Sequence, residues 1–278
     1  MINDINSKKL IDFYNNFFNK LDKNLEKYFY KNQLNKILKT DFKKINIPLP
    51  FQTFNQEGSS AFPIDVYDLT RLHKIITSLK IISVLELGSG ESTRIMADAL
   101  RINKKNYFNE SLLMKIRKKD KFKIHSIETE KKYLQITEKK TKTLQKYVKY
   151  YYTGAIQTQY NNNICGRYKT IPSVSANLIY IDGPSPYSYK EKNFNYIDLG
   201  SPEITNITCD LLLMEPYLLP GTVVIFDGLT NNAYFNIQRL KRNWLWKHNL
   251  KFDYTIMALT DKPLGIHNIN ELKFQKII

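Results

Sequence analysis

The pattern of apolar positions divides the chain into an N-terminal part and a longer remainder. Up to about residue 45, apolar side chains recur every three or four positions with lysines between them, which predicts amphipathic helices. Prolines at 48 and 50 end this pattern, because proline lacks an amide hydrogen and disfavours helix before it. We therefore expect residues 1–60 to form a helical extension and connector. Its predicted apolar face comprises Leu10, Tyr14, Phe17, Phe18, Leu21, Leu25 and Tyr28.

From residue 61 the pattern changes to short, almost continuous apolar runs that alternate with helical stretches. Such runs are typical of parallel strands buried on both faces. The alternation predicts an α/β fold over 61–278: a doubly wound, mostly parallel seven-stranded Rossmann-like sheet that ends in an antiparallel hairpin. The expected strands are 83–87, 123–127, 148–152, 178–181, 222–226, 252–258 and 264–278; the expected helices lie near 92–103, 130–147, 203–218 and 234–248, and the expected insertions are 104–121 and 184–202.

One predicted strand runs directly into a glycine turn and then into a helix. Gly88 and Gly90 allow a ligand to approach the main chain closely, and Ser92 or Thr93 can cap the helix that follows. In doubly wound sheets, ligands bind at the carboxyl ends of the strands near such a turn. The predicted cofactor contacts in this stretch are Glu86, Gly88, Ser89, Gly90, Ser92 and Thr93.

The residues around this turn favour S-adenosylmethionine (SAM) over a dinucleotide. A dinucleotide fingerprint has a third glycine, where this chain has Thr93. The carboxylate of Glu86 is also unfavourable beside a pyrophosphate. It suits the ammonium and sulfonium groups of SAM instead.

Residues 86–93 resemble motif I of the class I SAM-dependent methyltransferases, and the resemblance extends from about residue 61 to the C-terminus. Residues 125–128 resemble the second strand of that family, which implies that Glu128 accepts hydrogen bonds from the ribose hydroxyls of the cofactor. Residues 178–184 and 219–227 resemble the fourth and fifth strands. At the end of the third strand, residues 152–155 lack the acid that often marks the adenine site in the family. The resemblance implies a SAM-dependent methyltransferase with SAM as its cofactor.

Asp182 and Asp227 end two adjacent predicted strands, at the edge where a methyl acceptor would lie. A hydroxyl acceptor must lose a proton, so each aspartate is a candidate catalytic base, and Asp182 is also a candidate cofactor contact. The alternative for both is a turn or capping role, since Asp-Gly pairs favour turns. Among the histidines, only His267 is considered as a base.

The strand ends at Asp182 and Asp227 also bear on the methyl acceptor and on whether a metal ion is needed. Catechol-type O-methyltransferases, which this layout resembles, hold magnesium with a third acid or amide, where this chain has Gly228. We therefore expect no metal site, although two aspartates alone do not exclude Mg²⁺. The overall pattern most resembles bacterial O-methyltransferases of small molecules or sugars. We expect in-line methyl transfer to a small-molecule or carbohydrate acceptor, such as a glycan precursor.

Charge adds an alternative function. The chain has 42 basic and 26 acidic residues, a net charge of +16. Its residues 101–150 contain 16 of the basic and 5 of the acidic side chains. Such a region would suit an RNA methyltransferase that holds phosphates, although charge runs are more often solvated faces. A third hypothesis is a non-catalytic SAM-fold module that assembles, as a homo-oligomer, through its N-terminal helices.

The remaining composition excludes several classes. Two cysteines, Cys165 and Cys209, are too few for a disulfide framework or a zinc cluster. No apolar run reaches the roughly 18 residues of a transmembrane helix. The first residues lack the pattern of a secretory signal, so a cytoplasmic location is expected. The aromatic N-terminal helices are expected to pack on their own domain, rather than on another copy or a membrane.

Overall fold

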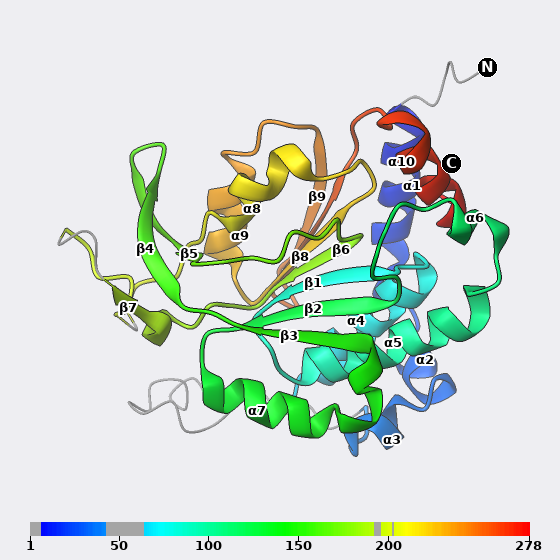
Figure 1. The fold of residues 1–278 in the computed structure, drawn as a ribbon, viewed down its shortest axis with the longest axis horizontal. Helices are drawn as coiled ribbons and strands as arrows, with labels where there is room; N and C mark the ends of the chain where they lie inside the picture. Colours follow the sequence, from blue (N-terminus) through cyan, green and yellow to red (C-terminus); the bar gives the residue numbers. More distant parts are fainter. Residues whose placement is uncertain (1–6, 43–63, 192–195, 202) are drawn as a thin grey trace.

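A seven-stranded sheet forms the centre of the molecule, and helices cover both of its faces (Figure 1). The computed structural model describes residues 7–42, 64–191, 196–201 and 203–278. In spatial order, the strands are β3 (Val148–Tyr152), β2 (Lys123–Glu128), β1 (Ser83–Leu87), β6 (Leu178–Ile181), β8 (Val223–Asp227), β10 (Tyr254–Leu259) and β9 (Trp244–Asn249).

The strand order reverses between β1 and β6. From β1 the chain builds outward through β2 to β3, and it then returns to place β6 and β8 on the other side of β1. These five strands pair in parallel, whereas β10 is antiparallel to both β8 and β9. The expected fold, mostly parallel with a C-terminal antiparallel hairpin, is confirmed. Because parallel strands end at one edge, the carboxyl ends of β1, β2, β6 and β8 meet there, on the left of Figure 1.

Two apolar clusters fill the space between the sheet and its helices. One combines residues of β1 and β6 with Ile75 of α4 and Leu100 of α5, and the other combines the opposite face with Leu211 of α8 and Ala233 of α9. The sheet is therefore buried on both faces, as the apolar runs predicted. The helices that follow the N-terminal region are α4 (Val66–Ser78), α5 (Glu91–Tyr107), α6 (Ser111–Met114), α7 (Lys131–Lys140), α8 (Asp210–Met214), α9 (Thr230–Ile237) and α10 (Gly265–Phe274).

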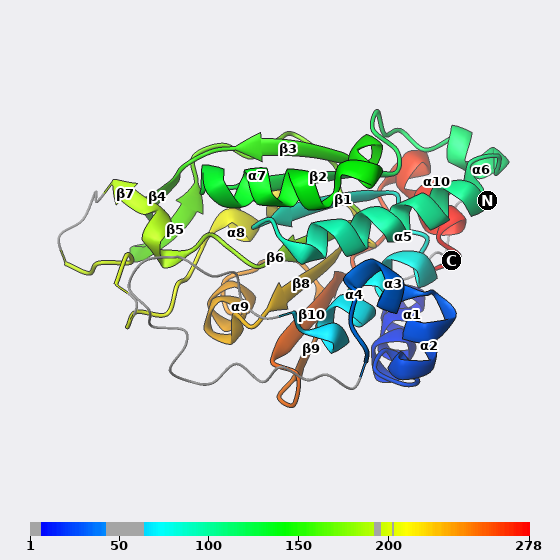
Figure 2. The same cartoon turned by 90° about the horizontal axis from the view of Figure 1, so that it is seen from below.

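The N-terminal helices α1 (Ser7–Lys20), α2 (Leu25–Lys31) and α3 (Leu34–Leu38) pack on the same domain (Figure 2). Leu10, Tyr14 and Phe18 of α1 belong to the main core, and the Tyr14 hydroxyl donates to the Gly221 carbonyl at 2.8 Å. The apolar face of α1 is therefore used within the chain, so a second copy would have to contact another surface. Among the described helices, none combines the length and the apolar character needed to cross a membrane.

Two elements near the C-terminus differ from the prediction. Residues 244–248, expected to be helical, lie in strand β9, and residues 265–274, expected to be a strand, form helix α10. In α10, Asn268, Ile269, Glu271 and Leu272 are buried with the i, i+1, i+3, i+4 spacing of one helix face, rather than at alternating positions. The helix expected over 203–218 is also shorter, since α8 covers only Asp210–Met214. Pro216, which lacks an amide hydrogen, lies in the 3-10 turn that follows and limits the helix at its C-terminal end. The antiparallel hairpin exists, but it is formed by β9 and β10.

A second, three-stranded sheet was not predicted. Its order is β5-β4-β7, and the hairpin of β4 and β5 projects from the edge where the main strands end (Figure 1). Asn161 and Asn162 join the two strands with φ of 46° and 64°. Paired asparagines are a known signal for this kind of hairpin turn, because they tolerate positive φ. The bounds are β4 (Ala155–Tyr160), β5 (Asn163–Tyr168) and β7 (Tyr189–Glu191).

Candidate functional site

The glycine turn after β1 lies directly against the turn after β6. Gly88 has φ of +101°, and a Cβ built on it would lie 3.0 Å from the carbonyl carbon of Asp182 and 3.1 Å from the nitrogen of Gly183. The backbones are held by hydrogen bonds from Gly88 N–H to the Ile127 carbonyl at 3.0 Å and from Asp182 N–H to the Leu87 carbonyl at 2.9 Å. Only glycine fits this conformation and this spacing without strain.

Glu86 lies beneath the turn and is fully buried. Its carboxylate accepts hydrogen bonds from three hydroxyls: Ser92 Oγ at 2.6 Å, Thr93 Oγ1 at 2.7 Å and Ser126 Oγ at 2.5 Å. Burial raises the pKa of Glu86 to about 7, although the three hydroxyls oppose the shift. Through Ser92 and Thr93, Glu86 therefore connects the end of β1 to the start of α5. Its direct contact with a cofactor stays a prediction.

Thr93 and Gly90 complete the start of α5. The Gly90 N–H donates to Thr93 Oγ1 at 3.1 Å, while the same hydroxyl donates to Glu86. Thr93 thus links the buried acid to the first free amide of the helix. This explains in physical terms why a threonine, rather than a third glycine, follows the turn.

Glu128 ends β2 beside the turn. Its Oε2 accepts from the amide of Ser89 at 3.0 Å and from the Ser89 hydroxyl at 2.9 Å. Its Oε1 accepts from the amides of Thr129 at 2.7 Å and Glu130 at 3.0 Å. The structure therefore brings together Ser89 and Glu128, two residues predicted to bind the cofactor, with the carboxylate already oriented.

Asp182 and Asp227 end β6 and β8 close to each other. Asp182 is exposed to solvent, and the protein atoms near it partly desolvate its carboxylate. Burial, followed by the negative charges of Asp227, Glu86 and Glu128, raises the pKa of Asp182 well above its ordinary value. The Asp227 carboxylate is half-buried and accepts from the Tyr180 hydroxyl, and burial raises its pKa.

Helix α4 adds charged groups that were not predicted. Burial and then the charge of Asp227 raise the pKa of Asp68 to about 8. Arg71 pairs with Asp68 and with Asp22, the latter at 2.7 Å, and its guanidinium lies 4.0 Å from the centre of the Tyr254 ring. In the sequence, α4 shows only an apolar helical stripe, so these residues could be assigned only once the packing of α4 was known.

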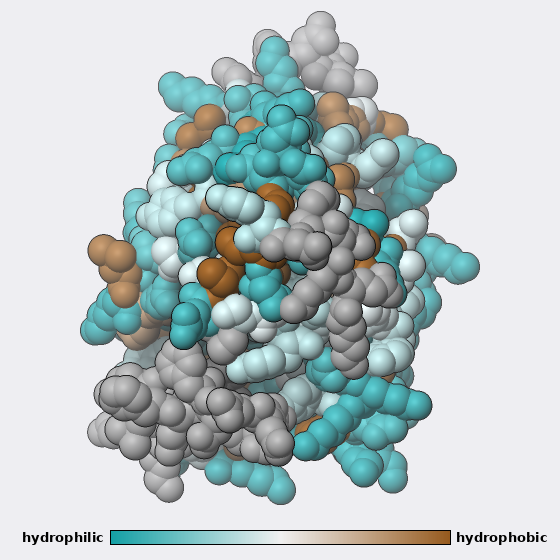
Figure 3. All heavy atoms as spheres, turned by 90° about the vertical axis from the view of Figure 1, so that its left-hand side faces the viewer, coloured by the Kyte–Doolittle hydropathy of each residue, from teal (hydrophilic) through white to brown (hydrophobic). Residues whose placement is uncertain are grey.

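The space around Asp227 is small. Asp68, Arg71, Tyr180, Asp227 and Tyr254 line a cavity of about 10 Å³, which holds roughly one water molecule. Asp182 is therefore the more accessible of the two aspartates. Figure 3 faces this side of the molecule and shows a patch of apolar side chains surrounded by hydrophilic ones.

Other candidate groups lie elsewhere. His267 is on α10, where the neighbouring Asn268 side chain donates to the Pro220 carbonyl before β8, at the edge opposite Asp182. Within the described part of the chain, no group of three or more histidine, cysteine or acidic side chains is arranged to hold a metal ion.

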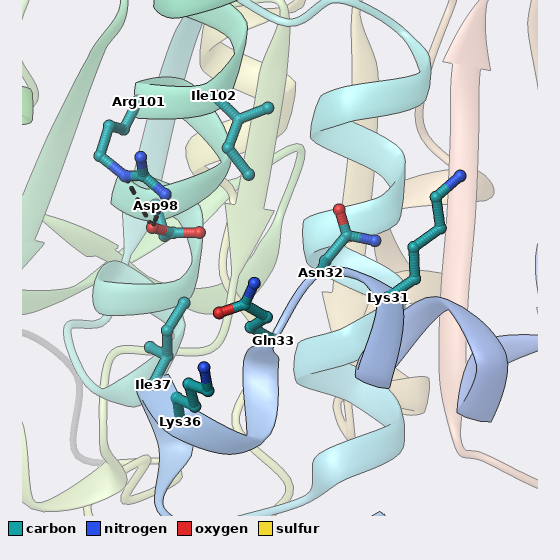
Figure 4. A pocket seen from close by; sticks show the side chains of 8 residues that line it. All are labelled: Lys31, Asn32, Gln33, Lys36, Ile37, Asp98, Arg101 and Ile102. Carbon is teal, nitrogen blue, oxygen red and sulfur yellow. Dashed lines mark hydrogen bonds and ion pairs between the residues drawn. The ribbon is translucent and has the colours of Figure 1, made fainter.

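A larger cavity, of about 360 Å³, lies between α3 and α5 (Figure 4). It contains none of the predicted site residues. Its side chains come from the second half of α5 and from the α2–α3 region, and Arg101 and Asp98 face each other across an ion pair. This cavity is therefore separate from the glycine turn. Its lining residues are Lys31, Asn32, Gln33, Lys36, Ile37, Asp98, Arg101 and Ile102.

Comparison with known proteins gives distant structural similarity. No protein-family model matches the chain, and no curated protein matches it. An SAH-bound methyltransferase of Podospora anserina, PaMTH1, is 12% identical, with 90% of this chain and 96% of that chain covered and a TM-score of 0.44. The O-methyltransferase TomG of Streptomyces achromogenes, in complex with SAM, is 14% identical, covering 72% and 82%, with a TM-score of 0.41. An O-methyltransferase of Bacillus cereus in complex with SAH is 13% identical, covering 84% and 89%, with a TM-score of 0.39.

These solved structures are methyltransferases, the class that the sequence also resembles.

Proposed function

We propose that this protein is a SAM-dependent methyltransferase that methylates a hydroxyl group of a small molecule or a sugar precursor. The observation that carries the proposal is the close contact of the Gly88 turn with the Asp182–Gly183 turn at the point where the strand order reverses. A ligand at this point lies over glycine backbone and between strand ends. Glu128 lies beside it, with its carboxylate oriented by Ser89.

The chemistry of the surrounding groups fits the cofactor. Glu86, Glu128 and Asp182 bring three carboxylates to a turn in a protein whose net charge is +16. Carboxylates favour a ligand that carries an ammonium and a sulfonium, and they disfavour a pyrophosphate. Glu128 would hold the ribose hydroxyls, and the turn residues 88–90 would hold the amino-acid end.

Methyl transfer forms a bond between the acceptor oxygen and the methyl carbon while the bond from that carbon to sulfur breaks. The cofactor supplies the methyl group on a positively charged sulfur. Asp182 would accept the proton that the acceptor hydroxyl loses. Its raised pKa makes it a stronger base than an ordinary carboxylate, and its exposed position lets an acceptor reach it. Asp227, bonded to Tyr180, would keep a negative charge beside Asp182 that sustains this pKa.

The RNA hypothesis has less support from the structure. Several cations of the 101–150 region are paired with acids: Lys118 with Glu271 at 2.8 Å and Lys149 with Asp120 at 2.7 Å. These pairs reduce the charge that is available to phosphates. We therefore place the small-molecule or carbohydrate acceptor first and keep RNA as the alternative outcome of the test.

Calorimetric titration with SAM and SAH tests the cofactor, and SAH release with a panel of hydroxyl-bearing sugars and phenols tests the acceptor. We expect both nucleosides to bind at micromolar concentration. Absence of binding would overturn the proposal and favour a non-catalytic module. If SAH is released only with RNA, and RNA affinity falls steeply with salt, the acceptor assignment is wrong and the RNA alternative holds.

A further inference from the structure

The hydroxyl of Tyr168 is buried next to the proposed cofactor site and has no hydrogen-bond partner among the described residues. Tyr168 is the last residue of β5, and it is 2% exposed. Its side chain belongs to the apolar cluster that also contains Leu87 and Ile181, the last residues of β1 and β6. Its hydroxyl oxygen makes no hydrogen bond within the part of the chain that the structure describes. A phenylalanine would pack equally well here, so packing does not explain why the residue carries a hydroxyl. Buried hydroxyls normally have a hydrogen-bond partner.

The position of this hydroxyl is defined by the turn that follows β6. A Cβ built on Gly183 would lie 2.8 Å from the Tyr168 oxygen, 3.2 Å from the Gly88 Cα and 3.4 Å from the Leu87 carbonyl oxygen. The phenol therefore ends where the turns after β1 and β6 meet. These turns lie at the switch point of the sheet, the point where the strand order reverses. Glycine at 183 leaves room for it.

The phenol is held as a donor. After burial, the charges of Glu128, Asp210 and Asp182 are among the causes that raise the pKa of Tyr168 well above its ordinary value. The group therefore keeps its proton at any physiological pH. The Tyr168 amide donates to the Asp210 carboxylate at 3.1 Å, and the Lys169 amide donates to the Gly154 carbonyl at 2.8 Å, so the backbone at the end of β5 is fixed.

We propose that Tyr168 is a positioning residue of the cofactor site, which gains a hydrogen bond at the Asp182–Gly183 turn when a ligand occupies the switch point. This inference rests on the proposed function. Glu128 and Asp182, the carboxylates on either side, are the residues expected to contact the cofactor and the acceptor. A bound ligand that shifts the Asp182–Gly183 turn slightly would bring an oxygen atom of this turn within hydrogen-bond distance of the Tyr168 hydroxyl. The hydroxyl then stabilises the ligand-bound arrangement alone, because it contributes no hydrogen bond in the ligand-free one.

The test compares Tyr168→Phe with Tyr14→Phe. Both tyrosines are buried, but the Tyr14 hydroxyl donates to the Gly221 carbonyl at 2.8 Å, before β8 and far from the strand ends. For Tyr168→Phe we expect the melting temperature of the ligand-free protein to stay the same or to rise by about 2–4 °C, because an unsatisfied hydroxyl is removed. We expect its affinity for SAH to fall about five- to tenfold. For Tyr14→Phe we expect the reverse: a lower melting temperature and an unchanged affinity for SAH.

Two results would overturn the inference. One is a Tyr168→Phe protein that binds SAH as tightly as the wild type, and the other is a clear loss of stability of this variant without ligand, since the hydroxyl would then have a partner in the free protein. Wild-type protein that fails to bind SAH would instead overturn the proposed function. The stability comparison of the two variants would still report on the hydroxyl itself, so the two failures are distinguishable.

Discussion

The carboxylates at the carboxyl edge of the sheet fall into two regions that differ in how they are satisfied. On the β1–β2 side, Glu86 and Glu128 accept hydrogen bonds from hydroxyls and amides of the protein itself. On the β6–β8 side, Asp182 and Asp227 lie near each other and near Asp68. Their negative charges are offset by the hydroxyl of Tyr180, which donates to Asp227, and by Arg71, which pairs with Asp68.

The difference shows which part of the site is complete before a ligand arrives. A carboxylate with several donors is oriented and needs no partner, whereas crowded carboxylates with few donors repel each other and hold protons more tightly. The β1–β2 side is thus a preformed binding surface. On the β6–β8 side, the carboxylates of Asp182 and Asp227 have few hydrogen-bond donors and raised pKa values. Such carboxylates are better proton acceptors, and proton transfer from an acceptor hydroxyl requires one.

The largest effect is expected from Gly88→Ala, which breaks the preformed side. A methyl group there would lie 3.0–3.1 Å from the Asp182–Gly183 backbone, at a φ of +101°. We expect a loss of about 2–4 kcal/mol in the free energy of unfolding and at least about a hundredfold loss of SAH affinity. Urea denaturation and calorimetry measure the two quantities.

Gly265→Ala is the matched control for that variant. Gly265 also has positive φ, +65°, but nothing lies within 4 Å of its added methyl group. It should lose only about 1–2 kcal/mol for its backbone conformation and keep its SAH affinity. If the two variants behave alike, close packing of the two turns is not what requires glycine at 88.

Asp182→Asn tests the basic side. We expect turnover to fall by about 10²- to 10⁴-fold, because the acceptor hydroxyl loses its base. SAH affinity should change less than about threefold, and stability should not fall, since one of several repelling charges is removed. Steady-state SAH release and thermal melting check these points. Unchanged turnover would remove Asp182 from the catalytic role, and the same loss of activity with a large loss of SAH affinity would place it on the cofactor side.

The smallest effect concerns the pH dependence of stability. Burial raises the pKa of Glu86 from its ordinary value of 4.5 to about 7, so the folded state binds more protons than the unfolded state between these values. Stability contributed by Glu86 is therefore present below about pH 4.5 and is lost as the pH rises through 7. We expect Glu86→Gln to flatten the decline of the unfolding free energy of the ligand-free protein between pH 5 and 8.

Urea denaturation at pH 5 and at pH 8 measures how steeply the unfolding free energy falls with pH. Glu203→Gln, which alters an exposed acid, is the control and should leave the slope as it is in the wild type. A slope that is the same in Glu86→Gln and in the wild type would contradict the assignment.

The central strands could be predicted from sequence because their apolar character is local. Strands β1, β3 and β6 have the predicted limits. In β1 and β6 every residue is buried, so the apolar run itself marks the strand, whereas β3 is an edge strand that is only partly buried. Strand β10 was predicted, but its partner β9 and helix α10 were misassigned. The residues of β9 are half-buried or exposed, and α10 buries the polar Asn268 and Glu271 beside its apolar residues, so apolar spacing alone does not identify either element. The β4–β5 hairpin had a local signal in Asn161-Asn162 that was overlooked.

For the candidate site, the sequence indicated the positions but not the partners. Ser89 and Glu128 were expected in the site, and the structure joins them directly. That Glu86 is enclosed by hydroxyls, and that Asp68 and Arg71 of α4 face Asp227, depends on how distant segments pack. The same holds for Tyr168, whose hydroxyl lies by the turns after β1 and β6.

The docking of α1 has a consequence for how the protein folds. Residues at the end of α1 and just after it bond to the last two strands: Asn19 accepts from Lys247, and Asp22 accepts from Asn249 and from Tyr254. These contacts join residues more than 220 positions apart. During synthesis, helix α1 is made more than 220 residues before the strands that it contacts, so these contacts form only after β9 and β10 have been made. Contacts of such long range slow folding, so the docking of α1 is expected among the late steps, and the nascent helix is a natural binding segment for chaperones until then.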